Sequence, residues 1–381
     1  MSNTFPLSAT TLFGLEEILA EELRSLGAKN IRVQRRFVEF SGDQYIMYKA
    51  NLWCRTAIRI LKPIASFAIH KEKDLYNEIK KIRWDQYITT KSTIAIDSFV
   101  RNSIFTHSLY VSQLTKDAII DQMRDKSGSR PGVDLKDPDL RLNLHIQHNN
   151  VVLSLDSSGD SLHKRGYRIQ TNTVPLNEVL AAGILYLTGW DRNSSFIDPM
   201  CGSGTFLIEA AMMALGRIPG YYRSKFGFMR WLDFDAGLYR NIQDEAVKAE
   251  KDALAFPIEG SDVNKKTFQI ACRNVQNAAM EDFIQIHHKA FEEQTPPPAP
   301  GVMVMNPPYG ERQEVNQLLE KYKMIGDILK IMYEGYTAYI LTGNLQEAKH
   351  IGLRTSFRKE LFNGPIECRL LKFELYSGSR R

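Results

Sequence analysis

The residues in this sequence best suited to chemistry form the NPPYG stretch, Asn306 to Gly310, which directly follows the apolar run VMVM. Pro307 and Pro308 fix the backbone and remove two amide donors, which leaves carbonyl oxygens pointing into a site. The Asn306 side-chain oxygen and the Pro307 carbonyl can then accept the two hydrogens of an exocyclic NH₂ group. Tyr309 offers a flat face on which an extruded or single-stranded base can stack. The motif therefore predicts a site that presents the amine of a base.

Such an amine needs help to react, because the lone pair of a nucleobase NH₂ is delocalised into the ring. Two acceptors hold the nitrogen in line with a methyl donor and favour the electron density that develops on it. This is catalysis by positioning and electrostatics. It requires neither a covalent intermediate nor a strong general base.

A second candidate site is the glycine loop DPMCGSGTF, Asp198 to Phe206, where a predicted strand ends and a helix begins. Gly202 and Gly204 let the backbone approach a ligand at the carboxyl edge of a parallel sheet. Position 207 is Leu, and no Gly-Lys-Ser/Thr follows, so dinucleotide and nucleoside-triphosphate interpretations are weakened. The acid at the strand end, Asp198, suits a ligand with a positively charged amine or sulfonium.

A third feature is Asp262 in the stretch GSDVNKK, at the end of the next predicted strand. A carboxylate in this position can accept both hydroxyls of a ribose, because its two oxygens match the spacing of a vicinal diol. The alternative is that Asp262 caps the helix that starts near Lys265.

These sites need a framework that brings strand ends together, and the sequence after Thr173 predicts one. Helices near 180–187, 206–215, 265–279 and 313–334 alternate with strand-like SSFID, IEGSDV, FIQIHH, VMVMNPP and TAYILTG. Alternation of this kind predicts a doubly wound parallel sheet. Two stretches, 217–257 and 294–301, are expected to be irregular inserts.

The first half of the chain has a different pattern, with short strands and helices that predict an α+β region. Residues 1–170 hold 25 basic and 19 acidic side chains, whereas residues 171–381 hold 24 and 25. A basic half beside a neutral half fits a module that docks on phosphate, joined to a chemistry module. Between them lies the polar stretch 156–168, which we interpret as a linker. Its basic residues Lys164, Arg165 and Arg168 are candidate RNA contacts. The alternative is that they only keep the linker solvated.

The remaining composition excludes several classes of protein. The four cysteines, at 54, 201, 272 and 368, form no CxxC or close Cys/His pair, so we expect no zinc site and no disulfide framework. The adjacent His287 and His288 would point to opposite faces of a strand, and no metal is expected there. No signal sequence and no long uncharged stretch is found, and the cytoplasm is the expected location.

The three motifs together resemble those of class I amino-methyltransferases, which use S-adenosylmethionine. The stretches SLHKRGYR, VPLNEVLAAGIL, IDPMCGSGTFLIEAAMMA, RIPG and NPPYGER are similar to those of the THUMP-containing RNA guanine-N2 methyltransferases, whose bacterial members act on 23S ribosomal RNA. The resemblance covers roughly 160–381, and it extends to a ferredoxin-like segment and a THUMP module before that.

The resemblance implies a Rossmann-like methyltransferase domain over 173–381, preceded by a ferredoxin-like segment (1–60), a THUMP module (61–156) and a linker (157–172). Asn306, Pro307 and Tyr309 would present the target amine. The cofactor would be bound by Asp198, Pro199, Cys201, Gly202, Ser203, Gly204, Thr205, Asp262, Val263 and Asn306. Such families often carry an Asp near the adenine amine, but here the sequence is HHKAF, and the contact falls to Lys289 or Ala290.

The expected activity is methylation of the N2 amine of a guanine in 23S ribosomal RNA, or in a large-subunit precursor. Three alternatives stay open, because the NPPY motif presents an NH₂ group in each: a tRNA guanine-N2, a DNA adenine-N6 and a protein glutamine methyltransferase. A fourth alternative is an RNA-binding protein with an inactive methyltransferase fold, against which the intact Asn306-Pro-Pro-Tyr argues.

Overall fold

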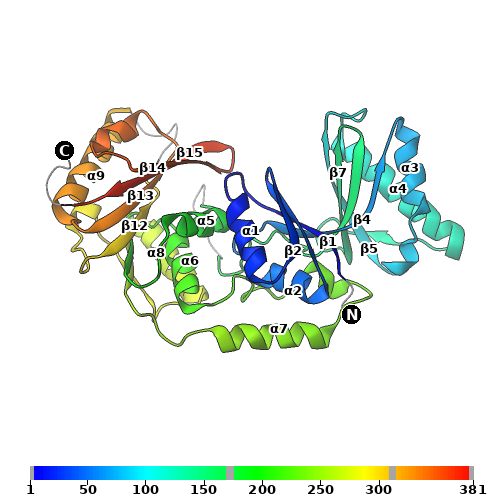
Figure 1. Cartoon of the computed structure of the whole chain (residues 1–381), viewed down its shortest axis with the longest axis horizontal. Coiled ribbons are helices and arrows are strands. Elements are labelled where there is room, and N and C mark those ends of the chain that lie inside the picture. Colours follow the sequence, from blue (N-terminus) through cyan, green and yellow to red (C-terminus); the bar gives the residue numbers. More distant parts are fainter. Residues whose placement is uncertain (1–3, 169–175, 309–314, 377–381) are drawn as a thin grey trace. The chain divides into compact units, whose positions relative to one another are not determined.

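The computed structural model describes residues 4–168, 176–308 and 315–376. Contacts divide these residues into two units (Figure 1). Unit 1 contains 4–11, 19–162 and 223–244, and unit 2 contains 12–18, 163–222 and 245–376. The helices α1 (Glu16–Ser25) and α7 (Ala236–Ala249) each contribute residues to both units.

Unit 1 is built on one sheet of eight strands in the order β2-β3-β1-β4-β8-β7-β5-β6. Their bounds are β1 Phe5–Thr10, β2 Lys29–Gln34, β3 Phe37–Gly42, β4 Arg59–Ala68, β5 Thr93–Arg101, β6 Gly132–Val133, β7 Leu140–Gln147 and β8 Asn150–Asp156. Strands β4 and β8 pair along their length and so join the ferredoxin-like and THUMP segments in a single sheet. The predicted α+β class of the first half is confirmed, while the boundary near residue 60 stays a prediction.

Strand β7 of unit 1 buries one face and leaves the other partly accessible. On β7, Leu140, Leu142, Leu144 and Ile146 are buried, and the residues between them are not. The other helices of unit 1 are α2 (Gln44–Trp53), α3 (Glu72–Lys81) and α4 (Ser108–Ser127). Helix α4 packs on β5 and α3 on α4, and both lie on one side of these strands (Figure 1). The alternation of buried and accessible residues is that of a sheet with one covered face.

The aromatic insert expected to be irregular contains a helix, α7, and most of its aromatic side chains pack in unit 1. The ring of Tyr48 on α2 stacks on Phe228 with centroids 4.1 Å apart, and Tyr239 on α7 meets both rings edge-on. The Tyr48 hydroxyl accepts a hydrogen bond from the Asp235 N–H at 3.1 Å. A segment that lies within residues 173–381, the range expected to form the methyltransferase domain, thus completes the core of unit 1.

Unit 2 is a seven-stranded sheet in the order β11-β10-β9-β12-β13-β15-β14, in which β15 runs in the direction opposite to the other six strands. Its strands are β9 Ser195–Asp198, β10 Ile258–Ser261, β11 Ile284–His287, β12 Gly301–Met305, β13 Tyr336–Thr342, β14 Phe357–Asn363 and β15 Ile366–Glu374. Its helices are α5 Glu178–Thr188, α6 Thr205–Leu215, α8 Lys265–Asn277 and α9 Val315–Met332. This confirms the predicted Rossmann-like sheet, and it places the ends of β9, β10 and β12 at one edge. Among the described helices, none is both long and apolar enough to cross a membrane.

Candidate functional site

The glycine loop turns from β9 into α6 as the sequence predicts. Gly202 and Gly204 have positive φ angles of 56° and 80°, a conformation that favours glycine. The Gly204 N–H donates to the Cys201 carbonyl at 2.8 Å, and α6 begins at the next residue. The loop therefore closes tightly over the end of β9.

Asp262 follows β10 and is joined to this loop. Its carboxylate accepts hydrogen bonds from the Gly202 N–H at 3.1 Å and from the Asn264 N–H at 2.8 Å. Burial raises the pKa of Asp262 above its usual range, while these bonds and the positive charge of Lys321 act in the opposite direction. The helix-cap alternative is not supported, because it is Asn264 whose side chain accepts from the first N–H groups of α8.

Asp198 lies beneath the loop. Its side chain is buried, and one carboxylate oxygen accepts from the Met200 N–H at 3.2 Å. Burial, with a smaller contribution from the charge of Asp262, raises the pKa of Asp198 well above its usual range. Asp198 therefore supports the loop from below.

A cavity of 690 Å³ opens at this edge of the sheet. The predicted residues that line it are Pro199, Gly202, Asp262, Val263, Ala290, Asn306 and Pro307. Among the described residues, six other predicted cofactor contacts are not in its lining: Asp198, Cys201, Ser203, Gly204, Thr205 and Lys289. Tyr309 lies outside the described residues. The three motifs therefore meet at one cavity, although parts of the glycine loop face away from it.

The walls of the cavity include residues that the motifs did not predict. Lys321 and Met324 come from α9, Asn363 and Ile366 flank the turn between β14 and β15, and Glu292 lies just after β11. The spacing of 321 and 324 is that of one helix face, which is a weak signal. No local pattern marks 363 or 366, since only the antiparallel return of β15 brings them to this edge.

Asn306 stands at the end of β12 with an acceptor that has no donor. Its side-chain oxygen is buried and has no hydrogen-bond partner in the described part of the chain. Buried polar atoms in folded proteins are nearly always paired, so an acceptor of this kind invites a donor from outside. Pro307 is buried beside it, and Pro308 also lines the cavity.

The basic cluster before the methyltransferase half requires a correction. Arg165 is 1% exposed, and its Nε donates to Glu209 of α6 at 3.3 Å. Arg168 forms an ion pair with Glu178 at 2.9 Å and donates to the Thr205 hydroxyl at 2.8 Å. Neither guanidinium is presented to RNA, because both are held by α5 and α6. They brace the helix that carries the glycine loop, and of the three predicted RNA contacts only Lys164 is exposed.

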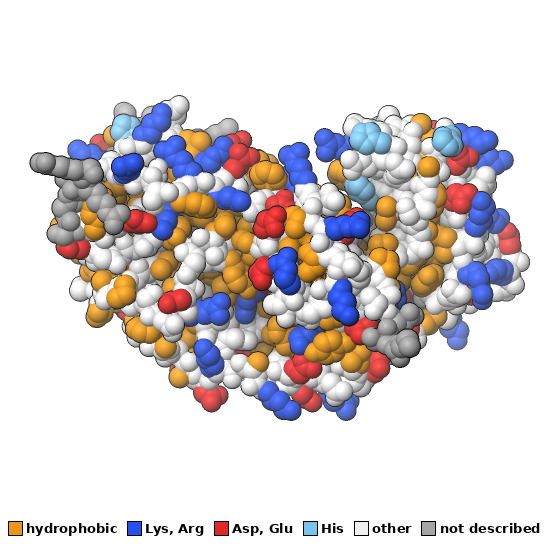
Figure 2. Space-filling view, in the orientation of Figure 1, with side chains coloured by type: hydrophobic (Ala, Val, Ile, Leu, Met, Phe, Trp, Pro, Cys, Tyr) orange, Lys and Arg blue, Asp and Glu red, His pale blue; other side chains and the backbone are white. Residues whose placement is uncertain are grey.

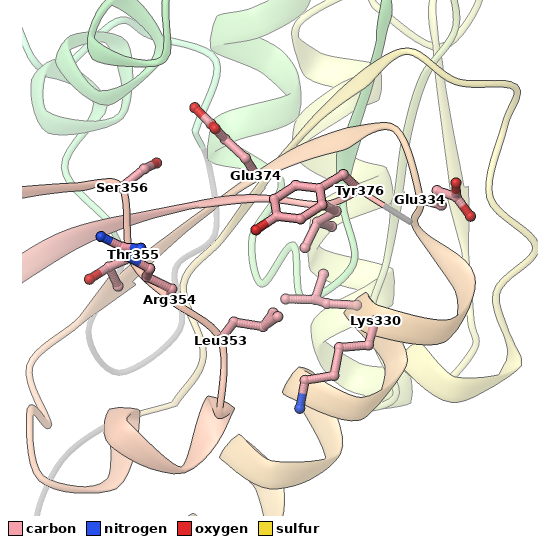
Figure 3. A pocket seen from close by; sticks show the side chains of 10 residues that line it. Lys330, Glu334, Leu353, Arg354, Thr355, Ser356, Glu374 and Tyr376 are labelled. Atoms are coloured by element: carbon pink, nitrogen blue, oxygen red, sulfur yellow. The ribbon is translucent and has the colours of Figure 1, made fainter. Parts of the chain in front are cut away.

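A second cavity, of 710 Å³, lies at the opposite edge of the same sheet (Figure 3). Lys330 lies in the last turn of α9 and Glu334 just after that helix. Arg354 comes from the approach to β14, Glu374 ends β15, and Tyr376 follows it. Ligands of open α/β sheets bind at the carboxyl ends of the parallel strands. The cavity at the glycine loop meets this rule, and the cavity in Figure 3 does not.

Comparison with known proteins decides the family. The profile of the RMKL-like methyltransferase domain matches residues 165–372, which is more than half of the chain. The chain belongs to this family. An RlmL ferredoxin-like domain matches 6–61, and a THUMP domain matches 70–156.

Relatives of this RMKL-like chain have RNA methyltransferase names. The Synechocystis protein slr0064, described as a candidate RNA methyltransferase, is 41% identical over 98% of both chains. The ribosomal RNA large subunit methyltransferase K/L of Methylococcus capsulatus is 40% identical over 98% of this chain and 52% of its own length. The RMKL-like chain thus spans about half the length of the K/L relatives it matches. SMU.472, a candidate methyltransferase crystallised with S-adenosylhomocysteine, superposes over its whole length with a TM-score of 0.90 and 26% identity.

Proposed function

We propose that this chain transfers a methyl group from S-adenosylmethionine to the N2 amine of a guanine in 23S ribosomal RNA. The observation that carries the proposal is the Asn306 side-chain oxygen, a buried acceptor at the end of β12 without a donor among the described residues. The names of the K/L relatives support ribosomal RNA as the substrate.

The residues of the chain act by holding the amine. Asn306 and the carbonyl of Pro307 accept its two hydrogens, which fixes the nitrogen and favours the positive charge that develops there. Tyr309 of the same motif would stack on the base. Bound S-adenosylmethionine supplies an electrophilic methyl group. The N2 proton is lost to solvent after transfer, so no strong base is needed.

The cavity at the glycine loop fits this cofactor. Asp262 presents an acid to a ribose, and Gly202 leaves open backbone beside it. Apart from its chain neighbours, no described residue has an atom within 4 Å of where a side chain of residue 202 would begin. The adenine would lie among Val263, Ala290 and Glu292. Related families often have an Asp near the adenine amine, and Glu292 would take its place here, because the stretch HHKAF contains no acid.

Charge supports unit 1 as the RNA-holding part. The sequence of unit 1 has 26 basic and 20 acidic side chains, against 23 and 24 in unit 2. A THUMP match lies within unit 1. On the face shown in Figure 2, Lys and Arg are spread among acidic and apolar side chains. The assignment of unit 1 therefore rests on its net charge and on the THUMP match.

The substrate class is tested by incubating the chain with tritium-labelled S-adenosylmethionine and a mixture of ribosomal RNA, transfer RNA, genomic DNA and protein. We expect label that ribonuclease releases and that migrates with ribosomal RNA. Label on transfer RNA would favour the tRNA alternative, and label on DNA or protein would favour the adenine or glutamine alternatives. Absence of S-adenosylhomocysteine binding by calorimetry would favour the inactive alternative.

Asp262→Asn should weaken binding of S-adenosylhomocysteine by roughly 10- to 150-fold, the range for a hydrogen bond to a charged group. Because burial raises the pKa of Asp262, its carboxylate is protonated at a higher pH than an ordinary Asp. The affinity of the wild-type chain should therefore fall as the pH is lowered toward that pKa, while the variant shows a flatter profile. Calorimetry at several pH values measures both, with the exposed Asp282→Asn as control. Equal affinities for Asp262→Asn and the wild type would remove the ribose contact from the proposal.

A further inference from the structure

The open face of the unit 1 sheet has features of a binding surface. A cavity of 550 Å³ is lined by residues of β1, β2, β3, β4, β7 and β8. In Figures 1 and 2 the strands β1 and β2 on one side and β7 on the other border a hollow within this unit. The core takes up the other face of the same strands, so this hollow lies on the face opposite the core.

Two aromatic rings stand at the edge of this cavity. His145 on β7 lines it, and Phe99 is the partner of His145 on the neighbouring strand β5. Their rings are parallel within 3°, with centroids 5.2 Å apart. Phe99 is nevertheless 54% exposed, so a large apolar ring is left in solvent. A ring in this position can continue the stack with one more flat group.

The polar groups of the cavity suit a nucleotide. Asn143 and Ser154 are cross-strand partners on the same face, and both line the cavity. The Thr10 hydroxyl, also in the lining, is buried and has no hydrogen-bond partner in the described ranges. An unsatisfied hydroxyl in the wall of a cavity can pair with a ligand that brings its own donor or acceptor.

Charges lie at the two ends of the face. Arg32 on β2 is exposed and lines the far side of the cavity, opposite Glu39. Arg101 is exposed two residues beyond Phe99, on the same face of β5. Asp97 is neutralised by Arg141 at 3.0 Å. The excess on β5 and β7 is therefore positive next to the ring stack, which favours a phosphate-bearing ligand.

We propose that this open face binds a single-stranded segment of the RNA substrate, with one base stacked on Phe99 and neighbouring nucleotides in the cavity lined by Thr10, Asn143 and His145. Single strands are recognised by this combination of exposed rings, hydrogen-bonding groups and nearby cations. A bound peptide strand would be expected at a sheet edge rather than on a sheet face. The proposal rests on RNA being the substrate, and it assigns a binding surface separate from the methyl-transfer cavity.

The test is fluorescence anisotropy of the full chain with a labelled single-stranded RNA of about 12 nucleotides, without methyl donor. Phe99→Ala should weaken binding roughly 5- to 150-fold, the range for loss of one base stack, and Phe99→Trp should keep it. The control is Leu109→Ala, an apolar residue that is 70% exposed on α4, the helix that packs on the covered side of β5, and it should bind like the wild type. Calorimetry with S-adenosylhomocysteine should give the same affinity for all four chains, which shows that they are folded.

Wild-type affinity in Phe99→Ala, or an equal loss in Leu109→Ala, would overturn this surface. Crosslinking in a cell extract that joins the peptide containing Phe99 to a protein, and not to RNA, would also overturn it. These results leave methylation of RNA untouched, because the labelling experiment on the proposed function needs no assumption about this face. Transfer of the labelled methyl group to DNA or protein would instead contradict the proposed function itself.

Discussion

Asn306→Ala is expected to slow methyl transfer to RNA by about 10²- to 10³-fold, the usual effect of removing one preorganised electrostatic contact to a reacting group. The substitution deletes the buried oxygen that has no donor in the described chain. It leaves Asp262 and the glycine loop in place, so binding of S-adenosylhomocysteine should change little. Single-turnover labelling measures the rate, and calorimetry measures the cofactor affinity.

Asn306→Asp provides the matched comparison, because it keeps an acceptor oxygen at the same place and changes only the charge and the amide nitrogen. It should retain more activity than Asn306→Ala. If both variants methylate at the wild-type rate, the amine is held elsewhere. If Asn306→Ala loses cofactor affinity and rate in the same proportion, Asn306 belongs to the cofactor site alone.

Glu209→Ala should destabilise the chain by about 3–5 kcal/mol, the range for breaking a buried ion pair from one side. Glu209 is 0% exposed, and it accepts hydrogen bonds from Arg165 Nε and from the Tyr167 hydroxyl at 3.2 Å. Without it, the guanidinium of Arg165 remains buried without this counter-charge. Urea denaturation followed by fluorescence measures the loss.

Two further variants check the cause of that loss. Asp327→Ala removes a surface ion pair with Lys330 in the same unit, and it should cost less than about 1 kcal/mol. A double change to apolar residues, Arg165→Met with Glu209→Leu, should recover much of the stability, because no charge is then left buried. A small effect of Glu209→Ala would mean that α6 does not depend on this brace.

Local motifs were enough to predict that three separate stretches meet at one edge of the sheet. Asn306, Gly202 and Asp262 each follow a strand of one parallel sheet, and the ends of such strands meet at one edge. A motif that directly follows a predicted parallel strand must lie at the carboxyl edge of the sheet. The position of the cavity could therefore be predicted without coordinates.

Features set by distant partners could not be predicted in this way. Arg165 and Arg168 look like a solvated basic cluster in the sequence, and only the positions of Glu209 and Glu178 show that both are held in ion pairs within the fold. The sequence did not predict the helix α7, because the aromatic residues before it break the alternation of helix and strand. These residues pack in unit 1. The cavity wall at Asn363 depends on the antiparallel return of β15, which has no local signal.

The most direct test of the methyl-acceptor assignment is mass-spectrometric mapping of 23S ribosomal RNA from cells with and without the gene. The proposal predicts that one guanine carries an N2-methyl group only when the gene is present, and that purified chain with S-adenosylmethionine restores it while Asn306→Ala does not. The proposal would be contradicted if 23S ribosomal RNA from the two cells carried the same methyl groups. It would also be contradicted if the methyl group that depends on the gene were found on transfer RNA, DNA or protein.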